Sequence, residues 1–265
     1  MDARLAQLLD YCRAAKTAAV AYSGGVDSAL TLWAASTALG QAALGVTVRS
    51  EFVCGAERQR AERIAAFLAQ AAGARVAVRD ISVLGHTRLR HNPPDRCYLC
   101  KQLVLAEVRA VALERLGPEA RLMEGTNADD DPARPGRRAV AEAGALSPLA
   151  ACGIDKAGVR ELARMIGLPN ADDPANSCLA TRVPTGAELS FARLTAIEGL
   201  EREARELGLS DLRARLAPGN GGHNADAVRL LVRPAQMLLA QSLARRLSER
   251  AQVIGFAHFS LGERT

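Results

Sequence analysis

Apolar segments of strand length alternate with helical segments through the first two-thirds of the chain. The strand candidates are 17–22, 43–48, 75–79 and 120–124, and the helices between them are 28–39, 56–72 and 99–116. Gly40, Gly73 and Gly117 follow these helices, as expected for glycines that cap helix C-termini. The alternation predicts an α/β fold with a parallel sheet that helices cover on both faces.

The pattern changes in the last third of the chain. An amphipathic helix over 155–166 is followed by a loop rich in Pro, Asp and Asn. The later candidates are helix 189–207, strand 211–216, strand 227–232, helix 235–249 and a last strand 252–256, with a flexible hairpin tip at 219–222. We therefore predict two domains, an α/β domain over 1–184 and a small α+β domain over 185–265.

Composition fits a protein with a sizeable apolar core. Hydrophobic residues make up 49% of the 265 residues and aromatic residues only 3%, so Ala, Leu and Val build that core. No apolar run approaches the roughly 18 residues of a membrane span, and the N-terminus does not resemble a signal peptide. We therefore expect a cytoplasmic protein without membrane contact.

The net charge of +5 does not by itself indicate nucleic-acid binding. Lys16, Lys101 and Lys156 are the only lysines among 34 basic residues, an arginine bias more typical of coding composition than of a binding face. Proteins that bind single-stranded nucleic acid usually carry a basic block with interleaved aromatic residues, and this sequence has none. Anionic nucleotide substrates account for a few arginines equally well, and we expect no nucleic-acid partner.

Residues 23–28, Ser-Gly-Gly-Val-Asp-Ser, follow the first strand and lead into a helix. Glycines permit a tight turn with exposed N–H groups, and the helix dipole adds positive potential, so this segment predicts an anion site. Ser23 and Ser28 add hydroxyl donors. Asp27 would repel bare phosphate but fits a site for Mg²⁺ on pyrophosphate. The segment is not a Walker A loop, because G-x-x-x-x-G-K-[ST] is absent.

Further polar residues follow the other strands of the predicted sheet. Arg49 and Ser50 come after the second strand, and 124–127 after the fourth. Ligands bind at the carboxyl ends of strands in such sheets, so these segments should face one crevice with the loop. The predicted ATP-binding residues are Ser23, Gly24, Gly25, Asp27, Ser28, Ser50 and Gly125.

Six cysteines occur, at positions 12, 54, 97, 100, 152 and 178. In a cytosolic protein they should be thiols, metal ligands or catalysts. Cys97 and Cys100 form a CxxC, which suits a redox pair, half a zinc site or a cluster site; the spacing of His86 and His91 matches no common zinc signature. With Cys178, three thiolates on a [4Fe–4S] cluster would leave one iron open to an extra sulfide. Three unconnected thiols are the alternative.

The loop 23–28 matches the SGGxDS PP-loop of the ATP pyrophosphatases, and other motifs extend the match. Together with segments 124–130, 134–136, 147–149 and 177–182, the sequence resembles the LarE family over about residues 5 to 260. Members are ATP-dependent sulfur transferases that help to build the nickel-pincer nucleotide of lactate racemase. The resemblance is specific through residue 186 and looser afterwards.

The resemblance implies a reaction and a set of reacting residues. A carboxylate of pyridinium-3,5-dicarboxylate mononucleotide is adenylated with ATP and Mg²⁺ and then converted to a thiocarboxylate. One branch of the family sacrifices a cysteine, which falls on Cys178 here. Another branch holds a [4Fe–4S] cluster on three cysteines, and Cys97 and Cys100 match the other two. The chain thus resembles the cluster branch, with Cys178, Cys97, Cys100 and Asp27 as its catalytic residues.

The same resemblance suggests binding residues and partners. Lys101 and Arg182 follow the cysteine motifs and should lie near the reacting sulfur. Arg213 and Arg215 alternate on a strand and resemble a phosphate clamp for the mononucleotide. Glu201 matches an acidic residue associated with metal binding. Leu231 on the next strand stands where relatives carry an acidic residue, which argues against a metal role for that strand. The family also implies a substrate-binding or oligomerising C-terminal domain and a homo-oligomer, and a sulfide donor protein would restock the cluster.

Other functions remain open at this point. A PP-loop tRNA thiolase with a cluster would need a basic, aromatic-bearing appendage or zinc knuckles, and neither is found. An amide-forming ATP pyrophosphatase that uses ammonia would not need three cysteines. A non-catalytic, nucleotide-responsive iron–sulfur sensor would not need an intact PP-loop.

Overall fold

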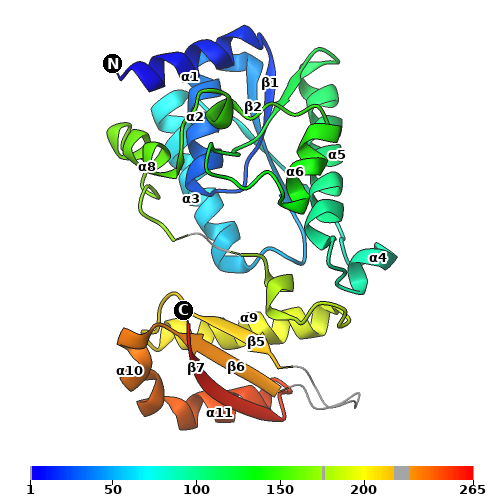
Figure 1. The fold of residues 1–265 in the computed structure, drawn as a ribbon, viewed down its shortest axis with the longest axis vertical. Coiled ribbons are helices and arrows are strands. Elements are labelled where there is room, and N and C mark those ends of the chain that lie inside the picture. The colour runs from blue at the N-terminus through cyan, green and yellow to red at the C-terminus, as the bar shows by residue number, and fades with distance from the viewer. Residues whose placement is uncertain (1, 175–176, 218–226, 265) are drawn as a thin grey trace. The chain divides into compact units, whose positions relative to one another are not determined.

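The computed structural model describes residues 2–174, 177–217 and 227–264. The chain forms two compact units, which Figure 1 shows as ribbons. The first comprises Met1–Ser50, Gly55–Ile81 and Asp95–Ala175, and the second comprises Glu51–Cys54, Ser82–Pro94 and Asn176–Thr265.

This division does not follow the predicted boundary at 184, because two early segments belong to the second unit. The N–H of Leu179 donates to the carbonyl of Phe52 over 2.9 Å. The amide nitrogen of Asn92 donates to the carbonyls of Val183 and Pro184 at 3.0 and 2.8 Å. Segments 51–54 and 82–94 are therefore tied to the chain that follows residue 176.

The first unit is an α/β domain with a parallel four-stranded sheet in the order β3-β2-β1-β4. Its strands are β1 (Ala18–Ala21), β2 (Ala43–Arg49), β3 (Val76–Asp80) and β4 (Arg121–Met123). Its helices are α1 (Ala3–Ala14), α2 (Val26–Leu39), η1 (Gly40–Ala42), α3 (Gly55–Ala72), α5 (Arg96–Leu116), α6 (Pro135–Glu142), α7 (Pro148–Ala151) and α8 (Lys156–Met165). The predicted fold class is confirmed.

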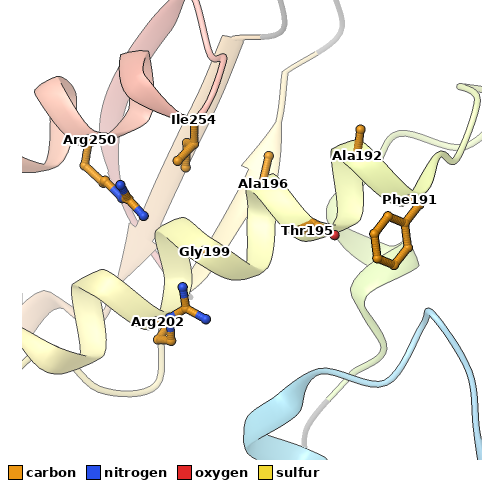
Figure 2. A pocket seen from close by; sticks show the side chains of 8 residues that line it. All are labelled: Phe191, Ala192, Thr195, Ala196, Gly199, Arg202, Arg250 and Ile254. Carbon is orange, nitrogen blue, oxygen red and sulfur yellow. The ribbon is translucent and has the colours of Figure 1, made fainter.

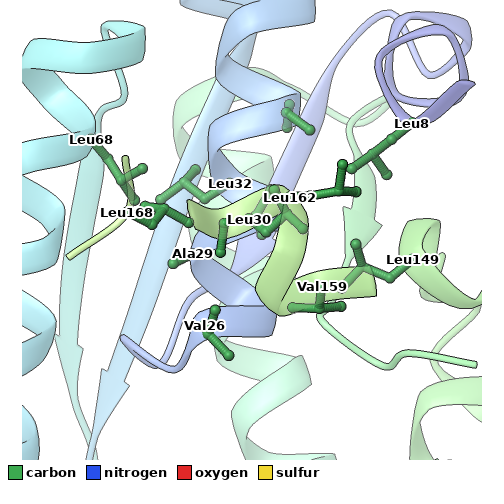
Figure 3. Close-up of a cluster of buried hydrophobic side chains, with 14 of the residues drawn as sticks. Leu8, Val26, Ala29, Leu30, Leu32, Leu68, Leu149, Val159, Leu162 and Leu168 are labelled. Atoms are coloured by element: carbon green, nitrogen blue, oxygen red, sulfur yellow. The ribbon is translucent and has the colours of Figure 1, made fainter. Parts of the chain in front are cut away.

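Helices cover both faces of this sheet because neighbouring residues of the strands point to opposite sides. Val20 packs with α1, α2, α3 and α8, a core that includes Leu8, Leu30 and Leu162 (Figure 3). Ala19, one residue earlier, packs on the other face with α5. Gly40 ends α2 with a φ of 55°, a conformation that favours glycine, as the sequence predicts.

The second unit carries a three-stranded sheet in the order β5-β6-β7, in which β5 and β6 are antiparallel and β6 and β7 parallel. Its elements are α4 (Thr87–Arg90), η2 (Leu179–Arg182), α9 (Phe191–Glu206), β5 (Arg213–Leu216), β6 (Ala227–Val232), η3 (Pro234–Gln236), α10 (Met237–Ser242), α11 (Ala244–Val253) and β7 (His258–Glu263). The predicted hairpin tip at 219–222 lies outside the described residues. No helix of the described chain is long and apolar enough to cross a membrane.

The end of the chain differs from its prediction. Residues 252–256 are not a strand, because α11 continues to Val253 and the last strand begins at His258. The N–H of Phe256 bonds back to the carbonyl of Ala251 over 2.9 Å, and Gly255 turns the chain with a φ of 105°. The predicted helix over 235–249 is also divided, because α10 ends at Ser242 and α11 begins at Ala244.

Candidate active site

The loop 23–28 leaves β1 and enters α2 in a conformation that its own hydroxyls hold. The Ser28 hydroxyl accepts from the Ser23 N–H at 3.2 Å, lies 3.1 Å from the Ser23 hydroxyl and donates to the Gly25 carbonyl at 3.0 Å. Gly25 is the N-cap residue of α2, and no side chain of the described residues caps this helix. The first-turn N–H groups and the helix dipole therefore suit an anionic ligand.

Two glycines allow close approaches around this loop. Gly24 has a φ of +78°, and a Cβ there would lie 2.5 Å from the Ala61 Cα. A Cβ on Gly125, in the loop after β4, would lie 2.7 Å from the Ser28 backbone nitrogen. The loops after β1 and β4 therefore meet at the start of α2, at the carboxyl edge of the sheet.

Asp27 is held by two side chains from other segments. Its Oδ1 accepts from the Asn127 amide at 3.0 Å, and its Oδ2 accepts from the Lys156 ammonium at 2.5 Å. Lys156 begins α8, and its backbone N–H donates to Asp129 at 2.9 Å. Lysine ammonium groups also bind phosphate oxygens, so Lys156 is a candidate for that role here. Sequence reasoning missed Lys156, although its rarity among so many arginines was a usable signal.

Other loop contacts surround the same edge. The buried amide of Asn170 donates to the Gly24 carbonyl at 3.0 Å.

Ser50 directly follows β2 and is buried, and the Arg58 guanidinium donates to its carbonyl at 2.9 Å. Arg49, the preceding residue, pairs with Asp80 at 2.8 Å, and this hydrogen-bonded carboxylate raises the pKa of the guanidinium. The predicted strand-end residues thus gather at one edge, and their binding roles stay predictions.

Glu124 connects this edge to the helix that carries the CxxC. Its buried carboxylate accepts from the Ser147 hydroxyl at 2.6 Å and from the Thr126 N–H at 3.0 Å. The Lys101 ammonium, on α5, lies 3.8 Å from the same carboxylate. The motifs at 124–130 and 147–149 are therefore structurally coupled, and Lys101 is anchored near them.

Cys97 and Cys100 are the second and fifth residues of α5, three positions apart and so on one side of the helix. Cys97 is exposed and Cys100 is half-buried. Cys178 is half-buried and precedes η2 in the second unit. Within the described residues no group of three or more His, Cys, Asp or Glu side chains gathers around a metal position. Ligation of a cluster stays a prediction.

The cysteines should differ sharply in reactivity. Cys12 is fully buried, and its burial raises the pKa of its thiol to about 12, so it stays protonated near neutral pH. We expect iodoacetamide at pH 8 to modify exposed Cys97 at least ~100-fold faster than Cys12, because the thiolate is the nucleophile. Peptide mass spectrometry over time measures both rates, with urea-unfolded protein as the control. Equal alkylation rates of Cys12 and Cys97 in the folded protein would contradict the burial of Cys12.

The second unit holds the predicted arginines Arg182, Arg213 and Arg215. Arg182 and Glu201 are both buried and pair at 2.9 Å. Arg213 and Arg215 alternate with buried Ala214 on β5, so both lie on the opposite face of the strand. Burial lowers the pKa of Arg213, and the nearby charges of Arg182 and Arg215 lower it further.

The register of this sheet shows where Leu231 lies, the residue that replaces the acidic residue expected from the resemblance. Leu231 on β6 pairs directly with Arg213 on β5. Directly paired residues of antiparallel strands have their side chains on one face, so Leu231 lies beside the Arg213 side chain and brings no charge there. The missing carboxylate argues against a metal site on β6, and the phosphate clamp of Arg213 and Arg215 stays a prediction.

A pocket of about 350 Å³ lies elsewhere on the second unit, along α9 and the end of α11 (Figure 2). It is lined by Phe191, Ala192, Thr195, Ala196, Gly199, Arg202, Arg250 and Ile254. None of the residues predicted to bind or react lines it.

The parallel sheet, the SGGVDS loop at the β1–α2 junction and its uncapped helix place the first unit in the PP-loop class of nucleotide-binding domains. No protein-family model matches the chain. An uncharacterized protein, slr1717, from Synechocystis is 33% identical over 81% of this chain and 78% of its own length. The pyridinium-3,5-bisthiocarboxylic acid mononucleotide synthase of Lactiplantibacillus plantarum is 30% identical over 91% of this chain and 84% of its own length. The chain belongs to the family of that synthase, the LarE family.

Proposed function

We propose that this protein is an ATP-dependent sulfurtransferase of nickel-pincer nucleotide biosynthesis. It adenylates a carboxylate of pyridinium-3,5-dicarboxylate mononucleotide, releases pyrophosphate and converts the adenylate to a thiocarboxylate. The observation that carries the proposal is the match to the Lactiplantibacillus synthase, which spans 91% of the chain. A homo-oligomer and a partner that donates sulfide remain expectations of the proposal.

The activating half of the reaction uses the first unit. A carboxylate is a poor acyl donor, because oxide would have to leave. Attack of a carboxylate oxygen on the α-phosphorus of ATP expels pyrophosphate and gives an acyl adenylate. The N–H groups of α2 and the hydroxyls of Ser23 and Ser28 would hold the departing phosphates, with Lys156 balancing their charge. The hard oxygens of Asp27 suit Mg²⁺, which when bound stabilises the charge on pyrophosphate.

The sulfur-delivering half uses the cysteines. Cys97 and Cys100 on one side of α5, with Cys178, would hold a [4Fe–4S] cluster, which when bound supplies a sulfide nucleophile. Addition of sulfur to the acyl carbon, followed by departure of AMP with the bonding electron pair, gives the thiocarboxylate. Arg213 and Arg215 would bind the phosphate of the mononucleotide.

An anaerobic assay with the full chain, ATP, Mg²⁺ and the mononucleotide tests the proposal. Pyrophosphate and the mass of the nucleotide product should be followed in the same reaction. We expect pyrophosphate release that depends on the mononucleotide and a product in which sulfur replaces one oxygen. Release that depends on tRNA instead would favour a tRNA thiolase, and no release with any candidate would favour a sensor.

Anaerobically purified protein is expected to be brown, with iron and acid-labile sulfide in the proportion of a [4Fe–4S] cluster. Cys97→Ser should lose most of this iron, because it removes one of three thiolate ligands. Cys152→Ser is the matched control, since Cys152 is half-buried and packs at the α1–α2 core. Colourless protein after reconstitution, or zinc in place of iron, would rule the cluster out.

A further inference from the structure

Arg182 directs its guanidinium into the interior of the second unit. Its Nε donates to Glu201 Oε1 at 2.9 Å. One terminal nitrogen donates to both the carbonyl and the hydroxyl of Ser177 at 2.7 Å and lies 3.4 Å from the carbonyl of Cys178. The side chain is only 2% exposed, so its donors serve the protein and not a ligand in solvent. Arg182 thus connects α9 to the loop that carries Cys178.

Glu201 fixes the other end of this connection. Its Oε1 also accepts from the backbone N–H of Ala214 at 3.1 Å, and its Oε2 accepts from Arg205 at 2.8 Å. The carboxylate is 1% exposed, and a buried carboxylate is tolerated only when it is paired and hydrogen-bonded. The carboxylate of Glu201 therefore accepts hydrogen bonds from Arg182 on η2, Arg205 on α9 and the backbone of Ala214 on β5. This donor set favours a counter-ion role over the predicted metal role.

The loop itself is tied on both sides of Cys178. The Thr181 hydroxyl donates to the Cys178 carbonyl at 2.7 Å and lies 3.2 Å from the Ser177 hydroxyl. The N–H of Leu179 donates to the Phe52 carbonyl at 2.9 Å. Because the backbone before and after Cys178 is fixed, the direction of its Cα–Cβ bond is fixed as well.

We propose that Glu201 and Arg182 are positioning residues for the Cys178 thiol. Glu201 orients the guanidinium, the guanidinium holds the Ser177 and Cys178 carbonyls, and the loop presents the sulfur in one direction. Arg182 is accordingly not a substrate contact, and Glu201 is not a metal ligand. The proposal rests on the proposed function only in giving Cys178 a sulfur-transfer reaction to serve.

Alkylation kinetics test the pair without any activity assay. The full chain, reduced and treated with chelator, is reacted with iodoacetamide, and the ratio of the Cys178 rate to the Cys97 rate is measured by peptide mass spectrometry. The variants are Glu201→Gln, which removes the charge, and Arg182→Lys, whose single nitrogen cannot bridge Glu201 and Ser177. Glu206→Gln is the control, because Glu206 is exposed on the same helix.

We expect both variants to raise the ratio by about fivefold or more, since a loosened loop exposes the thiol, and Glu206→Gln to leave it within about twofold. If both variants are folded and their ratios lie within about twofold of that of the unaltered protein, the proposal is overturned. If circular dichroism shows both variants unfolded, Ser177→Ala takes their place, because it removes only one acceptor hydroxyl of Arg182. The same criteria for the ratio of the Cys178 rate to the Cys97 rate then apply.

The proposed reaction supplies a second, separable readout. Arg182→Lys should lower thiocarboxylate formation and leave pyrophosphate release and half-saturation by the mononucleotide unchanged. A raised half-saturation concentration would make Arg182 a substrate contact and overturn its positioning role. Absence of pyrophosphate release in the unaltered protein would defeat the proposed function, whereas the alkylation ratio would still decide on the pair.

Discussion

Asp27→Asn is expected to lower pyrophosphate release at saturating ATP by roughly 100- to 1000-fold, the usual effect of removing one electrostatic group from an active site. Asparagine can still accept the hydrogen bond from Asn127, but it lacks the charge that pairs with Lys156 and would attract Mg²⁺. The protein should remain folded, because the Asp27–Lys156 pair is partly exposed and such pairs contribute about 0–1 kcal/mol. Initial rates of anaerobic pyrophosphate release measure the effect.

Asp129→Asn is the matched control for this prediction. It removes one negative charge from the same group of loops, but the Asp129 carboxylate faces the backbone N–H of Lys156, which an amide oxygen can still bind. We expect its rate to stay within about threefold of the unaltered protein, the range of an exposed charge change. An equal loss in both variants would assign the effect to net charge and would remove Asp27 from the site.

The first unit could be predicted closely from the sequence because its signals are local. Alternating apolar strands and glycine-terminated helices give β1–β4 and α2, α3 and α5 within a few residues. The gathering of the loop 23–28 with Gly125 also follows from general geometry, since the carboxyl ends of parallel strands share one edge. The structure adds the close approach of Gly125 to Ser28.

The last strand could not be placed because local composition misleads there. Val253 and Ile254 resemble strand residues, yet Val253 is 77% exposed on the end of α11. Ala251, two residues earlier, is fully buried and keeps the segment helical. The position of β7 is set by its parallel pairing with β6, which the sequence near 252–256 does not encode.

The side-chain partners at the candidate site could be predicted least. Asp27 and Lys156 are separated by 129 positions, and Arg182 and Glu201 by 19. The Glu201–Arg205 pair has helical i,i+4 spacing and could have been read from the sequence. The contact of Glu201 with Arg182 depends on how η2 packs on α9, which only the folded unit defines.

Gly24→Ala is expected to destabilise the first unit by about 2–5 kcal/mol, the sum of a left-handed φ and an overpacked contact. The added Cβ would lie 2.5 and 2.6 Å from the Cα and Cβ of Ala61, so the backbone of the loop or of α3 would have to shift. Urea unfolding followed by fluorescence of Trp33, the only tryptophan and a residue of α2, reports on this region.

Gly25→Ala is the control one residue away, and it is expected to have a much smaller effect. Gly25 has a φ of −75°, and the nearest atom to its added Cβ is the Ser23 hydroxyl oxygen at 3.6 Å. Alanine fits there and reduces the freedom of the unfolded chain, but it is a poorer N-cap residue than glycine, so the free energy of unfolding should change by less than about 1 kcal/mol. Equal destabilisation by both substitutions would contradict the close packing of Gly24 on α3, because Gly24, unlike Gly25, faces backbone atoms of α3 at short range.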